Sequence, residues 1–337
     1  MNTLKLLAGR RALTIAGAAV AVPATALLGF SAVSHGIYHR SNLSTLSEIY
    51  HRFTSNRHRL ADPIAFDNYV LEQASANDQP VDIPEVVPFK TSVESIEIGS
   101  TQTFLLNRRD RNDRAVIYVH GGSFLRRPNV YQWKFADILA RRTRAEIFMP
   151  MYPLAPNNTH AEAYASLEEV YHWVVDEYGA RNVTLMGDGA GGGLAVSFAQ
   201  HISDLGWEQP SHLILVSPWV DMTLGNPRVD EFEAHDPLLA PHGLRKVGAL
   251  WARGVDACDP LVSAVNGEVR NLRNVMVFAG TREILYPDAK LLYDRIAATG
   301  IHAEFHEGRG LNHNYPLYPT PEASKAMEAI VSAVTED

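Results

Sequence analysis

The chain has 337 residues, 46% of them hydrophobic and 20% charged, an ordinary composition for a globular protein with an ample core. Its formal net charge is −8, and the charged residues among the first 40 are all basic, so the remainder carries −12, which argues against a nucleic-acid-binding surface. The single cysteine, Cys258, excludes an intrachain disulfide and a zinc site built from thiolates.

The amino terminus predicts an export signal or a membrane anchor over residues 1–33. Lys5, Arg10 and Arg11 precede residues 12–33, which carry no charge and are just long enough to span a bilayer. Positive flanking charge keeps an amino terminus in the cytoplasm, so an anchor would leave the body of the protein outside. A cleaved signal fits equally well, with a cleavage site at residues 24–26. We therefore expect a membrane-bound or exported protein.

Residues 34–90 are polar and mixed, with a helical spacing of apolar side chains around Leu43, Leu46, Ile49 and Tyr50. Prolines at positions 80, 84 and 88 close this segment. The pattern predicts a helical region that precedes the main domain.

From residue 91 onward, short apolar runs alternate with helical patterns. The strand-like runs are residues 95–98, 103–106, 115–119, 146–151, 183–186, 212–216, 275–278 and 303–306, and the helical patterns are 130–142, 161–178, 194–205, 287–299 and 321–334. Continuous apolar runs are typical of strands that are buried on both faces. The alternation predicts an α/β fold over 91–337, with a mostly parallel central sheet flanked by helices. The polar segment 222–258 interrupts it, and we expect a lid there.

A glycine-rich motif, His120-Gly121-Gly122-Ser123-Phe124, follows the run 115–119. Paired glycines at such a position let the backbone approach a ligand closely. They also leave N–H groups free to stabilise an oxyanion that develops during acyl transfer.

A second motif, residues 185–192, reads LMGDGAGG and has the outline of a nucleophile elbow, G-x-S-x-G. In that elbow a sharp strand-to-helix turn lifts a serine to the top of an α/β sheet. In this chain the serine position is Gly189.

Three further motifs complete a series. They read YPLAP at 152–156, GTREIL at 280–285 and GLNH at 310–313, so an acid and then a histidine follow the elbow, in the order of α/β hydrolases. Together with HGGS and GDGAGG, these motifs resemble the hormone-sensitive-lipase-like branch, the alpha/beta hydrolase fold-3 esterases. The pattern of that branch is HGGG, YRLAPE, GDSAGG, GxxD/ExL and GxxH. Residues 217–219 (SPW) and 236–239 (DPLL) also look like that branch.

The resemblance covers about residues 90–337 and implies an α/β-hydrolase fold with a cap formed by residues 34–90. It implies an oxyanion hole whose N–H groups come from Gly121, Gly122 and Ala190.

The same resemblance implies that His313 is the general base and that Glu283 orients it. Many relatives have Asp at the position of Glu283, and Asp288 is an alternative acid in this chain.

Gly189 departs most from the pattern, because a nucleophile must present a hydroxyl or thiol to the base. In a well-studied triad, loss of the serine costs roughly 10⁶ in kcat, and the rest of the site retains about 10³–10⁴ over water. Glycine suits a strained turn, so we expect the elbow to fold. The lineage predicts a carboxylesterase that is weak or inactive as written, or a ligand-binding pseudohydrolase.

Two side chains are candidates to replace the missing nucleophile. Asp188 precedes the apex of the turn, so its carboxylate should point away from the cleft. Ser123 lies near the cleft and is the less unfavourable of the two.

A rival interpretation uses Gly187, Gly189 and Gly192, which also satisfy the dinucleotide fingerprint G-x-G-x-x-G. That fingerprint requires an acid at the end of the next strand. Asp221 comes late, beyond Pro218, and the other motifs would remain unexplained.

No metal motif is visible, because His39, His51 and His58 lack a ligand spacing. We expect no metal and no cofactor. The expected partners are a small-molecule ester or acyl ligand and, if residues 12–33 stay uncleaved, a membrane.

Overall fold

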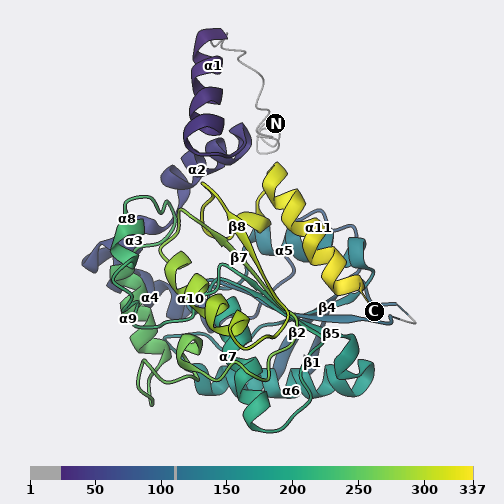
Figure 1. Cartoon of the computed structure of the whole chain (residues 1–337). Coiled ribbons are helices and arrows are strands. Elements are labelled where there is room, and N and C mark those ends of the chain that lie inside the picture. Colours follow the sequence, from purple (N-terminus) through teal and green to yellow (C-terminus); the bar gives the residue numbers. More distant parts are fainter. Residues whose placement is uncertain (1–23, 110–111, 337) are drawn as a thin grey trace, which may run out of the picture.

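A computed structural model describes residues 24–109 and 112–336. Within them an eight-stranded sheet runs through the centre of the molecule in the order β1-β2-β4-β3-β5-β6-β7-β8 (Figure 1). The strands are β1 (Val93–Ile98), β2 (Thr101–Leu106), β3 (Ala115–Val119), β4 (Glu146–Pro150), β5 (Val183–Asp188), β6 (His212–Val216), β7 (Val275–Gly280) and β8 (Ala303–Gly308). All eight predicted runs are strands.

Strands β3 to β8 are parallel, whereas β1 and β2 form an antiparallel edge. Every residue of β3, β4 and β5 is buried, which explains why these runs lack a polar alternation. The predicted α/β fold with a mostly parallel sheet is confirmed. Because the central strands share one direction, the loops after β3, β5, β6, β7 and β8 meet at one edge of the sheet.

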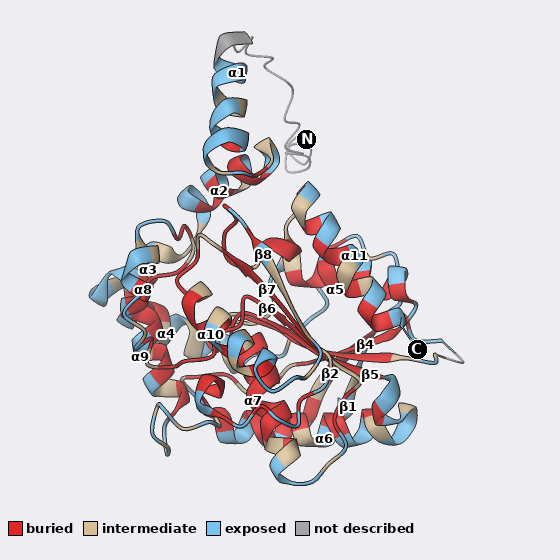
Figure 2. Cartoon of the chain, in the orientation of Figure 1, coloured by how far each residue is buried: buried red, intermediate tan, exposed pale blue. Residues whose placement is uncertain are grey.

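Helices cover both faces of the sheet. They are α5 (Val130–Thr143) and α11 (Pro321–Thr335) on one face, and α6 (His160–Tyr178), α7 (Ala190–Asp204) and α10 (Tyr286–Ala297) on the other. Figure 2 shows the sheet and the helix faces turned toward it as the buried part of the molecule. Capping boxes begin α5, through Asn129 and Gln132, and α6, through Thr159 and Glu162.

Helix α7 begins at Ala190, four residues before the predicted helix. Its first turn contains glycines that hide the apolar helical pattern. A methyl group on Gly191 would lie 2.1 Å from the carbonyl oxygen of Val119, and one on Gly193 would lie 1.9 Å from that of Trp219. The glycines therefore allow α7 to pack against the ends of neighbouring strands.

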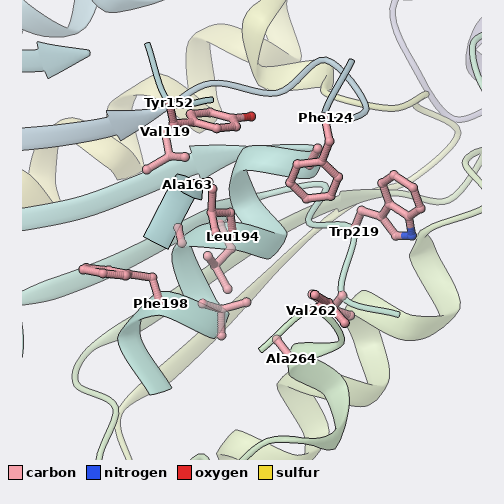
Figure 3. Close-up of a cluster of buried hydrophobic side chains, with 14 of the residues drawn as sticks. Val119, Phe124, Tyr152, Ala163, Leu194, Phe198, Trp219, Val262 and Ala264 are labelled. Atoms are coloured by element: carbon pink, nitrogen blue, oxygen red, sulfur yellow. The ribbon is translucent and has the colours of Figure 1, made fainter. Parts of the chain in front are cut away.

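Aromatic packing fixes the HGGSF loop. The ring of Phe124 stacks on Trp251 at 4.0 Å and lies 5.5 Å from Trp219, and Figure 3 shows Phe124 facing Trp219. This cluster ties the loop after β3 to the segment after β6 and to helix α9 (Pro241–Trp251).

Most of the remaining elements come before β1 or between β6 and β7 in the chain. They are α1 (Ala24–Ala32), η1 (Val33–Ile37), α2 (Asn42–Thr54), α3 (Arg57–Ala61), α4 (Pro63–Asn77), α8 (Val229–Glu233), α9 and the short turns η2 (Ala180–Asn182), η3 (Ala264–Asn266) and η4 (Tyr315–Leu317). The helical spacing around Leu43–Tyr50 corresponds to α2. The predicted lid segment 222–258 contains α8 and α9, and α9 packs closely on α3, since a methyl group on Gly243 would touch Leu60.

Most of the predicted anchor or signal, residues 12–33, lies outside the described residues. Among the helices between residues 24 and 336, none is long and apolar enough to cross a bilayer. The anchor and the cleaved signal therefore stay predictions.

Candidate active site

The segment that resembles an elbow is a sharp turn between β5 and α7. Gly189 lies at its apex with φ +53° and ψ −119°, a conformation that favours glycine. The Gly189 N–H donates to the carbonyl of Val216 at 2.8 Å, and its own carbonyl accepts the Trp219 N–H at 2.9 Å. The backbone of the turn is thus held by the segment at the end of β6.

The missing side chain of Gly189 would point at His313. A Cβ at this position would lie 3.2 Å from His313 Nε2, 3.5 Å from Cε1 and 3.6 Å from Asn314 Nδ2. A hydroxyl one bond farther out would therefore lie within hydrogen-bond reach of the imidazole after an adjustment of a few tenths of an ångström.

The imidazole of His313 is oriented by Glu283. His313 Nδ1 and Glu283 Oε2 are 2.5 Å apart, and Glu283 is completely buried. The other carboxylate oxygen, Oε1, accepts hydrogen bonds from Ser217 Oγ at 2.8 Å and from the Gly280 N–H at 2.7 Å. With Nδ1–H donated to Glu283, the neutral ring presents its Nε2 lone pair to Gly189.

Electrostatics at His313 favour the protonated ring. Burial lowers the pKa of His313, but the charge and hydrogen bond of Glu283, together with the charges of Asp236 and Asp188, outweigh burial, so the pKa of His313 is raised above its ordinary value. A raised pKa makes the imidazole a stronger base.

The alternative acid, Asp288, lies elsewhere. It lies in the first turn of α10, and its Oδ1 accepts a hydrogen bond from Asn226 Nδ2 at 2.8 Å. Burial raises the pKa of Asp288 to about 6. The carboxylate at the histidine is therefore that of Glu283, and Asp288 is part of a separate surface hollow with Asp221.

The three predicted oxyanion donors differ in their partners. Among the described residues, neither the Gly122 N–H nor the Ala190 N–H has a hydrogen-bond acceptor, and both residues line the cleft. The Gly121 N–H instead donates to Asp188 Oδ1 at 2.9 Å. The N–H groups of Gly122 and Ala190 are therefore free donors, whereas the N–H of Gly121 holds the loop after β3 against Asp188.

Asp188 is saturated with hydrogen bonds. Its fully buried carboxylate accepts from Tyr118 at 2.7 Å, from Gln132 at 2.9 and 3.1 Å, and from Asn314 Nδ2 at 2.7 Å, besides Gly121. Burial raises the pKa of Asp188, although these hydrogen bonds oppose the change. A carboxylate with all its lone pairs engaged is a poor nucleophile, so its geometry favours a role in positioning the loops.

Ser123 lines the cleft with φ +55°. Within residues 24–109 and 112–336, no hydrogen bond joins its hydroxyl to His313. Asp221, the acid of the dinucleotide interpretation, bonds to Thr223 and lies outside the cleft.

Several supporting residues carried little or no sequence signal. Asn314 donates its N–H to Ser217 Oγ at 2.9 Å and its side-chain amide to Asp188, so it links the two halves of the site. Asp236, within the DPLL motif, accepts from the N–H groups of Leu238 and Ile284. Gln132, on α5, had no sequence signal, because only the fold brings it to Asp188.

The cleft above these groups has a volume of about 530 Å³. One part of its wall is apolar, and another part carries polar and cationic groups. The apolar part comprises Leu60, Leu238, Leu239, Leu244 and Leu285, and the polar part includes Arg126, Asn129, Tyr131 and Lys134. Residues from α2, α3, α4 and α9 line it together with the elbow, so both the 34–90 and the 222–258 segments contribute walls.

Comparisons with known proteins agree with this geometry. A family model described as alpha/beta hydrolase fold matches residues 116–317. An esterase of Acinetobacter venetianus is 28% identical over 65% of this chain and 74% of its own length. A triacylglycerol lipase of Mycobacterium tuberculosis is also 28% identical, over 52% of this chain, but the chain spans only 36% of that protein.

Among solved structures, a candidate esterase from Staphylococcus aureus superposes with a TM-score of 0.80 and 29% identity, covering 84% of this chain and 97% of the other. An esterase from the bacterial hormone-sensitive lipase family has a TM-score of 0.70 and 21% identity, covering 82% of this chain and 98% of the other.

Proposed function

Because this chain belongs to the alpha/beta hydrolase fold family and to its esterase and lipase lineage, we propose that it binds carboxylic esters in the cleft and hydrolyses them weakly or not at all. The bound ester would lie with its acyl group against the leucine wall. Its carbonyl oxygen would point at the free N–H groups of Gly122 and Ala190.

One observation carries this proposal: every neighbour of a nucleophilic hydroxyl is present, and the hydroxyl is absent. The Cβ direction of Gly189 ends 3.2 Å from His313 Nε2, which in turn is held by Glu283. Without an attacking oxygen the acyl-enzyme cannot form, so the two-step route through a serine ester is closed. Ester binding needs only the cleft, and the cleft is present although Gly189 has no hydroxyl.

The native chain tests both parts of the proposal. With p-nitrophenyl butyrate, nitrophenolate release should exceed the uncatalysed rate by no more than roughly 10³–10⁴, the residual effect of an oxyanion hole and binding. A fluorophosphonate should label no serine. Because Trp219 lines the cleft, p-nitrophenyl butyrate should quench the tryptophan fluorescence of the protein saturably. Ethyl butyrate should compete for the same cleft.

Stoichiometric labelling of a serine would show that the chain has another nucleophile and would overturn the proposed loss of catalysis. Quenching that stays linear in ester concentration would overturn ester binding.

A further inference from the structure

Helix α2 is amphipathic, but its apolar side faces solvent and its polar side faces the protein. Leu43, Leu46, Tyr50 and Phe53 recur at intervals of three and four residues, so they form one stripe along the helix. This stripe is exposed: Phe53 is 86% accessible, and the other three are each about half accessible, between 51% and 54%. A helix packed on a globular body normally turns its apolar stripe toward the core.

The opposite, polar side of α2 is the buried one. Glu48, 4% accessible, bonds to Arg40 at 2.5 Å and to Arg282 at 2.9 and 3.0 Å. Ser44 donates to Glu322 of α11 at 2.8 Å. These contacts fix the rotation of α2 about its axis, because turning the stripe inward would leave a buried charge without its partners.

The exposed apolar surface continues toward the amino terminus. Leu27 and Leu28 of α1 are 57% and 71% accessible, and Ile37 is exposed as well. Figure 2 shows α1 standing away from the sheet with most of its surface exposed. The sequence before it, residues 12–23, is also without charge. The apolar stripe of α2 is therefore next to further apolar chain and not isolated.

Charge separates this end of the chain from the rest. Residues 34–61, which follow the predicted anchor or signal, contain four Arg residues and one acid, Glu48, for a net charge of +3, whereas residues 62–337 carry −14. The one acid is buried against Arg40 and Arg282. An apolar stripe within a cationic segment is the signature of a helix that lies in the headgroup region of an anionic bilayer. A second copy of this chain fits less well, since two such cationic ends repel.

We propose that α2 is an interfacial helix, which seats its Leu43–Phe53 stripe in the surface of an anionic phospholipid bilayer. Docking requires no catalysis and goes beyond the proposed function. It also sets the direction of the cleft, because Tyr50 belongs to the stripe and, like Thr54 one turn later, lines the cleft. The mouth of the cleft then lies at the lipid surface, where apolar esters concentrate.

The test uses the full chain with Cys258 replaced by serine, so that one introduced cysteine can carry an environment-sensitive NBD fluorophore. Leu46→Cys and Phe53→Cys report on the stripe. Leu205→Cys and Leu291→Cys are matched controls, because these leucines are also about half accessible, at 48% and 46%, but lie outside α1 and α2. The protein is mixed with vesicles of equal parts phosphatidylcholine and phosphatidylglycerol, with or without a nitroxide on the acyl chains.

The labels at 46 and 53 should shift to the blue and be quenched by the acyl-chain nitroxide, whereas the labels at 205 and 291 should change little. Vesicles of phosphatidylcholine alone should give a smaller shift. The proposal is overturned if the stripe labels respond no more than the controls, even when residues 1–33 carry the protein onto the vesicles. It is also overturned if the stripe labels shift without lipid as protein concentration rises, which would indicate self-association. An equal shift on uncharged vesicles would overturn the requirement for anionic lipid.

Discussion

The two halves of the site differ in completeness. On the acid–base half, His313 is held by Glu283, Glu283 by Ser217 and the Gly280 N–H, and Ser217 by the Asn314 N–H. On the nucleophile half, the turn at Gly189 has its own hydrogen bonds but no side chain. The elbow therefore keeps its shape through backbone contacts and close helix packing, and this shape does not depend on the nucleophile.

Gly189→Ser should have the largest effect, because it gives the nucleophile half the side chain that it lacks. His313, Glu283 and two free N–H donors already lie around position 189, so kcat for p-nitrophenyl butyrate should rise on the order of 10³-fold or more. Serine at φ +53° costs about 1–3 kcal/mol of backbone strain, and the imidazole must shift slightly from its 3.2 Å contact. Steady-state kinetics measures the gain, and circular dichroism checks the fold.

Gly189→Ala is the matched control, because it adds the same Cβ and the same strain without a hydroxyl. It should stay inactive. Adding His313→Ala to Gly189→Ser should remove the gain, since members of a triad act as a unit. A folded Gly189→Ser protein without activity would contradict the view that a single oxygen is missing.

Glu283→Gln in the Gly189→Ser background tests the role of Glu283 in the acid–base half. The loss in kcat should be roughly 10²–10⁴, as for other triads whose acid is neutralised. The pH profile gives a second readout. With Glu283 present, kcat/KM should rise with pH, because the neutral imidazole is the active form. The midpoint of this rise should lie above 6.5, the ordinary pKa of histidine.

In the glutamine variant the charge of Glu283 no longer raises the pKa of the imidazole, whereas burial still lowers it, so the rising limb should move to lower pH while the plateau falls. Asp288→Asn is the control and should leave both limb and plateau unchanged. A large effect of Asp288→Asn would contradict the assignment of Glu283.

Glu48→Gln tests whether the amino-terminal helices support the acid–base half, because Glu48 binds Arg282 beside Glu283. Burial raises the pKa of Glu48, but Arg282 and Arg40 lower it from 4.5 to about 2. The folded-state pKa is thus depressed, so the stabilisation is present above pH 4.5 and is lost as pH falls toward 2. Removal should lower the free energy of unfolding by roughly 3 kcal/mol at pH 7.

Urea denaturation at pH 7 and pH 3 measures this difference, which should shrink at the lower pH. Glu72→Gln breaks the exposed pair with Arg59 and should cost at most about 1 kcal/mol. Equal losses in the two variants would show that the buried network contributes no more than a surface pair.

Ser217→Ala should have the smallest effect. It removes the hydrogen bond to Glu283 and the acceptor of the Asn314 N–H, at a cost of about 1–2 kcal/mol in unfolding free energy. In the Gly189→Ser background, a loss of about 1.4 kcal/mol of positioning would reduce kcat about tenfold. A loss as large as that of Glu283→Gln would show that Ser217 acts on the reacting groups themselves.

The amino-acid sequence alone predicted the order of strands and helices from residue 91 onward, because buried parallel strands are continuous apolar runs and their helices keep a 3.6-residue period. It also identified Gly189, Glu283 and His313 as one constellation, because short motifs fix the residue types at the ends of strands. The structure places these three residues together; their catalytic roles stay a prediction.

Features that depend on partners distant in sequence could be read only from the folded structure. It placed Glu283 rather than Asp288 at the histidine, and it turned the Gly121 N–H to Asp188. It also showed that α2 buries its polar side and exposes its apolar side. Local periodicity predicts that helix but would bury its leucines, whereas Glu48 meets Arg282, 234 residues along the chain, and that buried ion pair fixes the opposite face inward.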